Sequence, residues 1–129
     1  MTGSGYKIRL PVSCNADGSL NFACSIMEGS VMKIMDSEEG NQIESARRAA
    51  EMALQSIPFG TQVAGALIFD CSCRTMMLKE KLIQAIEATR QTLGSIPFLG
   101  CETYGEIAMD QGQLSGFHNA TTVIMLFPS

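Results

Sequence analysis

The sequence of 129 residues is marked first by several features that it lacks. It has no excess of basic residues, because 9 lysines and arginines stand against 13 acidic residues and leave a formal net charge of −4. Such a charge does not favour nucleic acid or an anionic membrane as a partner. No apolar run is long enough to span a membrane, and the amino end, MTGSGYK, lacks the apolar region of a secretory signal. We therefore expect a cytoplasmic protein that makes no membrane contact.

The sequence also lacks a disulfide framework and any sign of a second domain. Its 5 cysteines are odd in number and irregularly spaced, which indicates reduced thiols. No internal repeat or low-complexity tract interrupts it, and a composition that is 46% hydrophobic and 17% charged indicates a globular chain. The length suits one domain with one core. We assign residues 6–129 to that domain and residues 1–5 to a tag or linker remnant.

Apolar patterns and turn signals predict an α+β fold with the element order βββαβαββ. Asn15–Gly18 is a strong turn signal between the first two strands, and Pro58 ends the first helix. We expect two layers, with two helices packed on a mixed, mainly antiparallel sheet. The first predicted helix is capped by Asp36 or Ser37, becomes regular after Gly40 and ends at Ile57; the second is capped by Thr75 and runs from about Met76 to Leu93. A flexible loop is predicted at 110–116. The predicted strands are Tyr6–Cys14, Ser19–Met27, Val31–Met35, Val63–Phe69, one starting at Pro97–Cys101, and Ala120–Phe127.

Polar residues gather directly after the buried strand, in the stretch Val63–Arg74. Its apolar part ends in Asp-Cys-Ser-Cys-Arg, and a strand of this kind delivers polar side chains to one edge of a sheet. Two later polar clusters, Glu102–Ala108 and Phe117–Thr122, can reach the same edge. The sequence therefore predicts a ligand site there.

Arg74 has two interpretations in this cluster. Its guanidinium presents a rigid fork of donors that suits a carboxylate or phosphate of a ligand. Alternatively, it pairs with Asp70 or Glu106 and holds the strand ends together, and a buried Glu106 would need such a partner. The lone histidine, His118, has a structural role as its simplest interpretation.

Three chemical alternatives are weaker. Cys71, Cys73, Cys101 and His118 have the ligand types of a zinc site, but C-x-C is not the usual spacing and no second pair exists. Cys71 or Cys101 with His118 and Glu106 has the groups of a nucleophilic site, without an oxyanion-hole motif. A thiol-based redox sensor would use Cys71 or Cys73. We expect no metal, no cofactor and no enzymatic activity.

At these clusters the chain resembles the carboxyl-terminal half of the FIST family, a sensory domain of bacterial signalling proteins and of some F-box proteins. ALIFDCSCR (Ala66–Arg74) is similar to the family's strand and C-x-x-R segment, and TYGEIA within Pro97–Ala108 is similar to its T/S-Y-G-E-I segment. FHNATT (Phe117–Thr122) is similar to its H-N-x-T segment, and EGSVMKIMD (Glu28–Asp36) fits the lead-in. The chain departs from the family at Cys73 and at Cys101-Glu102, and the family's amino-terminal half is not recognisable.

The resemblance implies a small-molecule sensor of signal transduction, chemotaxis included, whose ligand is an amino acid or a related small anionic metabolite. It also implies a fused or associated signalling output domain. Two other functions stay open: a protein-interaction or dimerisation module, which would make a homodimer, and the redox sensor. By residue match, the resemblance gives a ligand-binding role to Cys71, Arg74, Thr103, Tyr104, Gly105, Glu106, His118 and Asn119.

Overall fold

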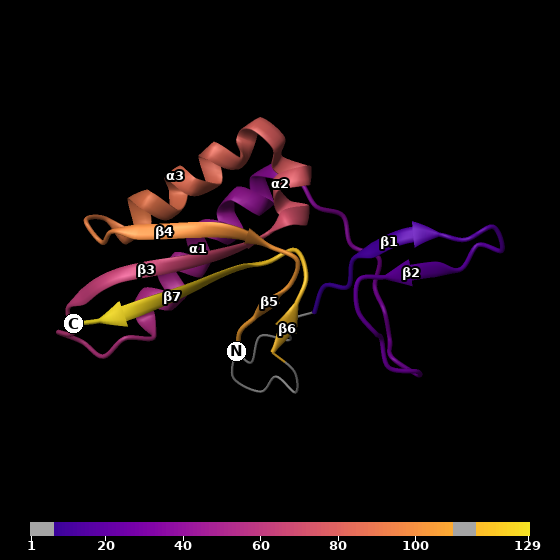
Figure 1. The fold of residues 1–129 in the computed structure, drawn as a ribbon, viewed down its shortest axis with the longest axis horizontal. Coiled ribbons are helices and arrows are strands. Elements are labelled where there is room, and N and C mark those ends of the chain that lie inside the picture. Colours follow the sequence, from indigo (N-terminus) through magenta and orange to yellow (C-terminus); the bar gives the residue numbers. More distant parts are fainter. Residues whose placement is uncertain (1–6, 110–115) are drawn as a thin grey trace.

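A three-stranded sheet with helices on one face forms the body of the molecule (Figure 1). We analysed a computed structural model, which describes residues 7–109 and 116–129; the predicted remnant at 1–5 and nearly all of the predicted loop at 110–116 lie outside the described residues. The central strand β3 runs parallel to β4 and antiparallel to β7. The α+β class and the two layers agree with the prediction. The elements of the body are β3 (Val63–Cys71), β4 (Phe98–Thr103) and β7 (Thr122–Pro128), with α1 (Glu39–Gln55), α2 (Ser72–Leu78), the short 3₁₀ turn η1 (Lys79–Lys81) and α3 (Leu82–Leu93).

The core lies between the helices and the inner face of the sheet. Ala66 of β3 is buried against Ala50 of α1 and Leu93 of α3, and side chains of β4 and β7 complete the cluster. Small alanines let α1 approach the sheet closely. Because side chains alternate along a strand, the residues next to Ala66 point to the opposite face.

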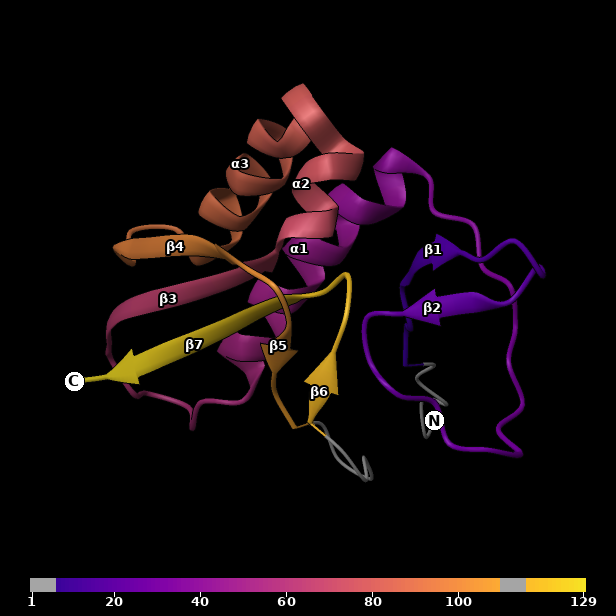
Figure 2. The ribbon, with the colours of Figure 1, turned by 45° about the vertical axis from the view of Figure 1, so that its right-hand side comes forward.

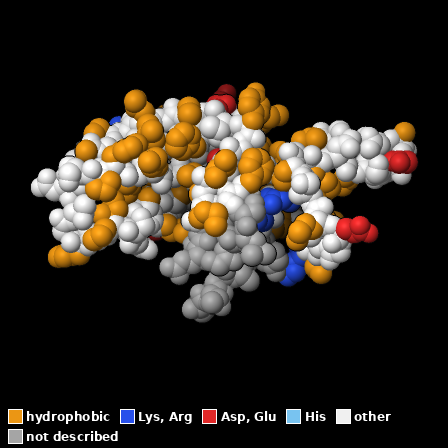
Figure 3. Space-filling model, turned by 60° about the horizontal axis from the view of Figure 1, so that its bottom comes forward, with side chains coloured by type: hydrophobic (Ala, Val, Ile, Leu, Met, Phe, Trp, Pro, Cys, Tyr) orange, Lys and Arg blue, Asp and Glu red, His pale blue; other side chains and the backbone are white. Residues whose placement is uncertain are grey.

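The outer face of the sheet is apolar and open. Leu67 of β3 lies between Leu99 of β4 and Met125 of β7, and the next outward row places Phe69 between Cys101 and Val123. Leu99 is 75% exposed. Figure 3 shows hydrophobic side chains gathered over this part of the surface.

The segment 7–38 forms an arm that projects from the body (Figures 1 and 2). It carries the predicted hairpin, whose turn is closed by a hydrogen bond of 2.8 Å from the Asn15 amide to the Ser19 carbonyl. The third strand predicted at Val31–Met35 is wrong: this stretch pairs with no other strand in the described chain, and Val31 and Ile34 are exposed. Its apolar pattern is compatible with a strand, but a strand also needs a neighbouring strand to pair with, and the pattern does not indicate one. The hairpin strands are β1 (Pro11–Cys14) and β2 (Leu20–Phe22).

The second predicted helix is divided in two and starts earlier than expected. It begins at Ser72, directly after β3, so Thr75 lies inside α2 and does not cap it. Lys79 has a positive φ of 50°, which ends α2, and the chain turns through η1 into α3. The break allows Leu78 to be buried with Ala46 and Ala85. Gly94, with a positive φ, ends α3 as predicted.

A second small hairpin leaves the end of the sheet (Figure 2). Its strands pair antiparallel, with Glu106 opposite His118 and Ile107 opposite Phe117. The prediction of one sheet therefore becomes three sheets, two of them hairpins. In the described residues, no helix combines the length and the apolar character that crossing a membrane requires. The hairpin strands are β5 (Glu106–Ile107) and β6 (Phe117–His118).

Candidate functional site

Polar groups converge at the end of the sheet where β3 and β4 finish and β7 begins. Asp70 is aligned with Glu102 and Thr122, and Cys71 is aligned with Thr103. The sequence predicted a polar edge at this place. Because Asp70 and Cys71 are consecutive residues of one strand, they point to opposite faces, and the polar groups divide into two networks.

The first network lies on the face that the helices cover, and we call it the helix-side network (Gln42, Ser45, Asp70, Arg74 and Thr122). Arg74 is fully buried, and its Nε donates to Asp70 Oδ1 at 2.6 Å. Its Nη1 donates to Ser45 Oγ at 2.9 Å and to Gln42 Oε1, and its Nη2 donates to the Gln42 carbonyl at 3.0 Å. Asp70 Oδ1 also accepts from Thr122 Oγ1 at 2.6 Å. The guanidinium thus joins α1, α2 and the sheet.

The ion pair expected between Arg74 and Glu106 does not form. The alternative pairing, with Asp70, is the one present. Arg74 follows Asp70 by one helical turn on the helix-covered face, whereas Glu106 belongs to the hairpin at the opposite face. Four of the five N–H donors of Arg74 are engaged within the protein, so its ligand-binding role remains a prediction.

The second network lies beneath the β5–β6 hairpin, and we call it the hairpin-side network (Cys71, Thr103, Glu106 and Thr121). Glu106 is 2% exposed. Its two carboxylate oxygens accept from Thr103 Oγ1 at 2.7 Å and from Thr121 Oγ1 at 2.9 Å. No ion pair of Glu106 exists within the described residues. Two hydroxyls therefore replace the cation that the sequence predicted.

Cys71 lies beside this carboxylate and is kept protonated. Burial is the largest cause that raises the pKa of its thiol, to about 11; the hydrogen bond with Cys73 and the charge of Glu106 act in the same direction. The two sulfur atoms of Cys71 and Cys73 are 2.8 Å apart. A buried, protonated thiol is a poor nucleophile toward molecules in solution at neutral pH, although the neighbouring Cys73 sulfur is within its reach.

The other four predicted site residues have separate positions. Tyr104 lies between β4 and β5 and is 95% exposed. A Cβ at Gly105 would lie 2.5 Å from the ring of Phe117, so this position requires glycine. Nε2 of His118 is 2.9 Å from the carbonyl of Ala108, and the buried Asn119 accepts from the Cys24 thiol of the arm at 3.4 Å. Of the eight residues, only Cys71, Thr103 and Glu106 are gathered in one network.

Sequence reasoning missed the partners that come from α1 and from the start of β7. Gln42 and Ser45 are three residues apart on one face of α1, together with Arg48 a further three along. This spacing places a row of polar side chains beside the alanines of the same helix, and it could have indicated that α1 takes part in the site. Thr121 and Thr122 stood within the FHNATT cluster, from which only the histidine and asparagine were chosen.

A hollow of about 330 Å³ lies between α1 and the segment Ala120–Thr122. Arg48 is part of its wall and has no hydrogen bond or ion pair in the described chain. Ala120 has a positive φ of 54°, a conformation that costs a non-glycine residue about 1–2 kcal/mol. The hollow touches both networks, through the residues that line it: Ile8, Asn41, Gln42, Ser45, Arg48, Ala49, Met52, Ala120, Thr121 and Thr122.

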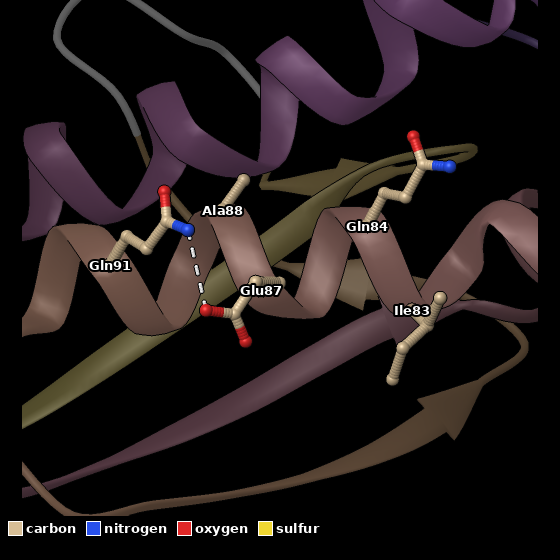
Figure 4. A pocket seen from close by; sticks show the side chains of 5 residues that line it. All are labelled: Ile83, Gln84, Glu87, Ala88 and Gln91. Atoms are coloured by element: carbon tan, nitrogen blue, oxygen red, sulfur yellow. Dashed lines mark hydrogen bonds between the residues drawn. The ribbon is translucent and has the colours of Figure 1, made fainter.

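A second hollow, of about 360 Å³, lies on α3 (Figure 4). All of its lining residues belong to this one helix, among them Ile83, Glu87 and Gln91. Gln91 donates to Glu87 at 3.3 Å, as surface residues of a helix commonly do. It has no wall from a second element and shares no residue with either network.

The described residues hold no cluster of three or more His, Cys, Asp or Glu side chains that could bind a metal ion. Cys101 is exposed on the outer face of the sheet, and Nε2 of His118 is in hydrogen-bond contact with the carbonyl of Ala108. The four groups weighed for zinc are therefore not assembled in this structure.

The fold and this site define a small α+β domain with buried polar networks beside a ligand-sized hollow. The FIST C domain matches residues 1–109, and the chain belongs to this family. FIST domains are sensory domains of signalling proteins. No curated protein and no solved structure matches the chain. The FHNATT cluster lies beyond the matched residues, so its likeness to the family rests on the motif alone.

Proposed function

We propose that this domain binds a small anionic metabolite, such as an amino acid, for a cytoplasmic signalling protein, and that the hollow between α1 and Ala120–Thr122 takes the ligand. The observation that carries the proposal is Arg48, an exposed guanidinium on the wall of this hollow that makes no hydrogen bond or ion pair in the described chain, the charge of Glu44 acting on it only over a longer distance. The neighbouring Arg47, in contrast, pairs with Glu44 and Glu51. An unpaired guanidinium beside polar groups is suited to a carboxylate.

Lys7 is a second cation, adjacent in sequence to a residue of the wall but not itself part of the wall. Lys7 precedes Ile8 of the wall, and its Nζ atom is buried without a hydrogen-bond partner in the described chain. A buried ammonium is costly unless an opposite charge accompanies it. An anion bound nearby would supply that charge.

The wall of the hollow offers a route from ligand to output. Gln42, Ser45 and Thr122 line the hollow and also belong to the helix-side network. A ligand that competes for Gln42 or Ser45 would weaken their bonds to Arg74 and so shift α2 relative to α1. Chemotaxis is one signalling output that such a domain could serve.

The proposal assigns no catalytic step to the domain. Cys71 is held as a neutral thiol, and the carboxylate of Glu106 is occupied by two hydroxyls. Each of these groups is engaged by neighbouring side chains and is not positioned to attack a bound molecule.

A thermal-shift series with L-glutamate, L-aspartate and succinate tests the proposal. A ligand present at about 100 times its Kd stabilises the folded state by about 2.7 kcal/mol, which raises the melting temperature by several degrees. Arg48→Gln should abolish the shift, and the matched control Arg47→Gln should keep it. The proposal fails if no such carboxylate changes the melting temperature, or if Arg48→Gln responds as the unsubstituted chain does.

Association of two copies is a second candidate, favoured by the apolar outer face of the sheet. That face presents Leu67, Leu99 and Met125 in one row, with no charged side chain among them. Two copies of a chain with net charge −4 can therefore meet there without like charges in contact. The arm adds further exposed apolar residues, Val31 and Ile34.

Light scattering across a concentration series tests this second candidate. We expect a dimer that Leu99→Asp converts to a monomer. The matched control is Ile83→Asp, which places the same charge at an exposed apolar position of α3. A monomer at every concentration, or equal effects of the two substitutions, would exclude the sheet face as the contact.

A further inference from the structure

The junction of β3 and α2 brings two thiols together. In an extended strand, residues two apart are separated by about 6.6 Å. Here the helix begins at Ser72, and the chain turns so that the sulfur atoms of Cys71 and Cys73 approach to 2.8 Å. A disulfide bond requires about 2.05 Å between the sulfur atoms and a Cβ–S–S–Cβ dihedral of about 85–100°, so the two sulfur atoms are about 0.8 Å from bonding distance.

We propose that Cys71 and Cys73 are a reversible dithiol–disulfide pair that a hydroperoxide, such as hydrogen peroxide, oxidises. The two thiols have different exposures, which gives them different roles. Cys71 is buried, whereas Cys73 is half-buried and reachable from solvent. Cys73 is therefore the sulfur that meets the oxidant, and Cys71 is the sulfur that resolves the product.

The reaction proceeds in two balanced steps. The Cys73 thiolate attacks one oxygen of hydrogen peroxide, the O–O bond breaks, and the products are a Cys73 sulfenic acid and hydroxide, which takes a proton to become water. The Cys71 sulfur then attacks the Cys73 sulfur; the S–S bond forms, the S–O bond breaks, and the departing hydroxide takes the Cys71 proton as a second water. In total, two thiols and one peroxide give one disulfide and two waters. A thiol reductant reverses the change by exchange.

The bond would act on the structure at a defined place. Cys73 directly precedes Arg74, whose four donor contacts join α1, α2 and the sheet. Fixing the first turn of α2 to the end of β3 restrains the residue on which the helix-side network depends. The ligand-free domain in its oxidised form should therefore differ from the reduced form in melting temperature.

Peptide mass analysis of the full chain tests the pair directly. Cleavage after lysine and arginine yields a peptide, Ala49–Arg74, that contains both cysteines and no other. After treatment with hydrogen peroxide and alkylation, this peptide should lack both alkyl groups and be lighter than the reduced peptide by two hydrogen atoms. When the oxidised chain is reduced before alkylation, the peptide should again carry two alkyl groups.

Two variants complete the test. In Cys73→Ser, the same peptide should remain singly alkylated at Cys71 at the peroxide dose that closes the disulfide in the unsubstituted chain. In Cys101→Ser, which removes an exposed thiol elsewhere, closure should be unchanged. The proposal is overturned if both thiols of the unsubstituted chain stay alkylatable, or if Cys73 accumulates as a sulfinic or sulfonic acid without a disulfide.

Discussion

The two polar networks at the end of the sheet stabilise an enclosed carboxylate in different ways. Each encloses a carboxylate, that of Asp70 or that of Glu106. The helix-side network neutralises its carboxylate with the fully buried guanidinium of Arg74. The hairpin-side network provides two threonine hydroxyls and no cation. Asp70 ends the central strand on the helix-covered face, whereas Glu106 belongs to the separate β5–β6 hairpin, beside Cys71 on the other face.

This difference separates the structural cation from the candidate ligand cation. Arg74 makes all its contacts within the chain, so it holds the fold together. Arg48 makes no hydrogen bond or ion pair in the described residues and lies on the wall of the hollow that both networks border. The partners of a charged residue at this edge therefore distinguish a structural role from a ligand-binding role.

The largest expected effect is the loss of the helix-side guanidinium. Arg74→Ala leaves Asp70 enclosed without its cation, and removing one partner of a buried pair costs about 3–5 kcal/mol. Chemical denaturation measures this as a lower free energy of unfolding. The control Arg47→Ala removes a half-buried surface arginine that also has two carboxylate partners and should cost about 0–1 kcal/mol. Equal losses for the two variants would contradict the structural role of Arg74.

Removing the carboxylate of the hairpin-side network should lower the free energy of unfolding by a smaller amount. Glu106→Ala removes two hydrogen bonds to a carboxylate, each worth at least about 1.5 kcal/mol, so we expect a loss of about 3 kcal/mol. The control is Glu102→Ala, an exposed glutamate on β4, which should change the free energy of unfolding by less than about 0.5 kcal/mol. A Glu106 variant as stable as the Glu102 variant would show that this carboxylate is not buried as described.

Closure of the hairpin over this network depends on Gly105. Gly105→Ala would place a Cβ 2.5 Å from the Phe117 ring, and such overpacking costs about 1–3 kcal/mol. Gly40, in the first turn of α1, has open space around it, so Gly40→Ala should instead stabilise the chain by about 0.4–1 kcal/mol. Denaturation curves of the two variants should move in opposite directions, and a Gly105 variant that gains stability would refute the tight contact.

The smallest effect is a pH dependence on the hairpin side. The pKa of Cys71 is raised from 9.0 to about 11, so the folded chain holds this proton more tightly than the unfolded chain does. The resulting stability is complete below the lower value and is lost as pH rises through the upper one. Under reducing conditions, the advantage of the unsubstituted chain over Cys71→Ala should therefore shrink from pH 9 to 11. A constant difference, as expected for the exposed Cys101→Ala, would show that the Cys71 pKa is not raised.

The sequence predicted the elements whose signals are local. The apolar run of β3 and its polar end, the turn at Asn15–Gly18 and the glycine that ends α3 are all present. The strand at Val31–Met35 was wrong because a strand exists only with a partner, and nothing in the local pattern reports one. The break at Lys79 was missed because it serves the burial of Leu78 among residues of other helices.

The candidate site was predictable as a place but not as a set of contacts. Arg74 finds Gln42 across 32 residues of sequence, which no local motif encodes. The pairing of Arg74 with Glu106 was inferred from charge alone, without the alternation of side chains along β3. Applied to Asp70 and Cys71, that alternation would have separated the two networks before the structure was known.

A double-mutant cycle between Arg74→Lys and Glu106→Gln tests the separation of the two networks most directly. Both substitutions keep the approximate size and the polarity of the side chain, so that each variant can fold. The one direct contact between the networks in the described residues is long, 3.5 Å from Thr103 Oγ1 to the backbone carbonyl of Asp70. If the networks are otherwise separate, the two losses in free energy of unfolding should add to within about 0.5 kcal/mol. A coupling well above that value would mean that the guanidinium and the carboxylate interact, and would contradict the division of this polar edge into two independent networks.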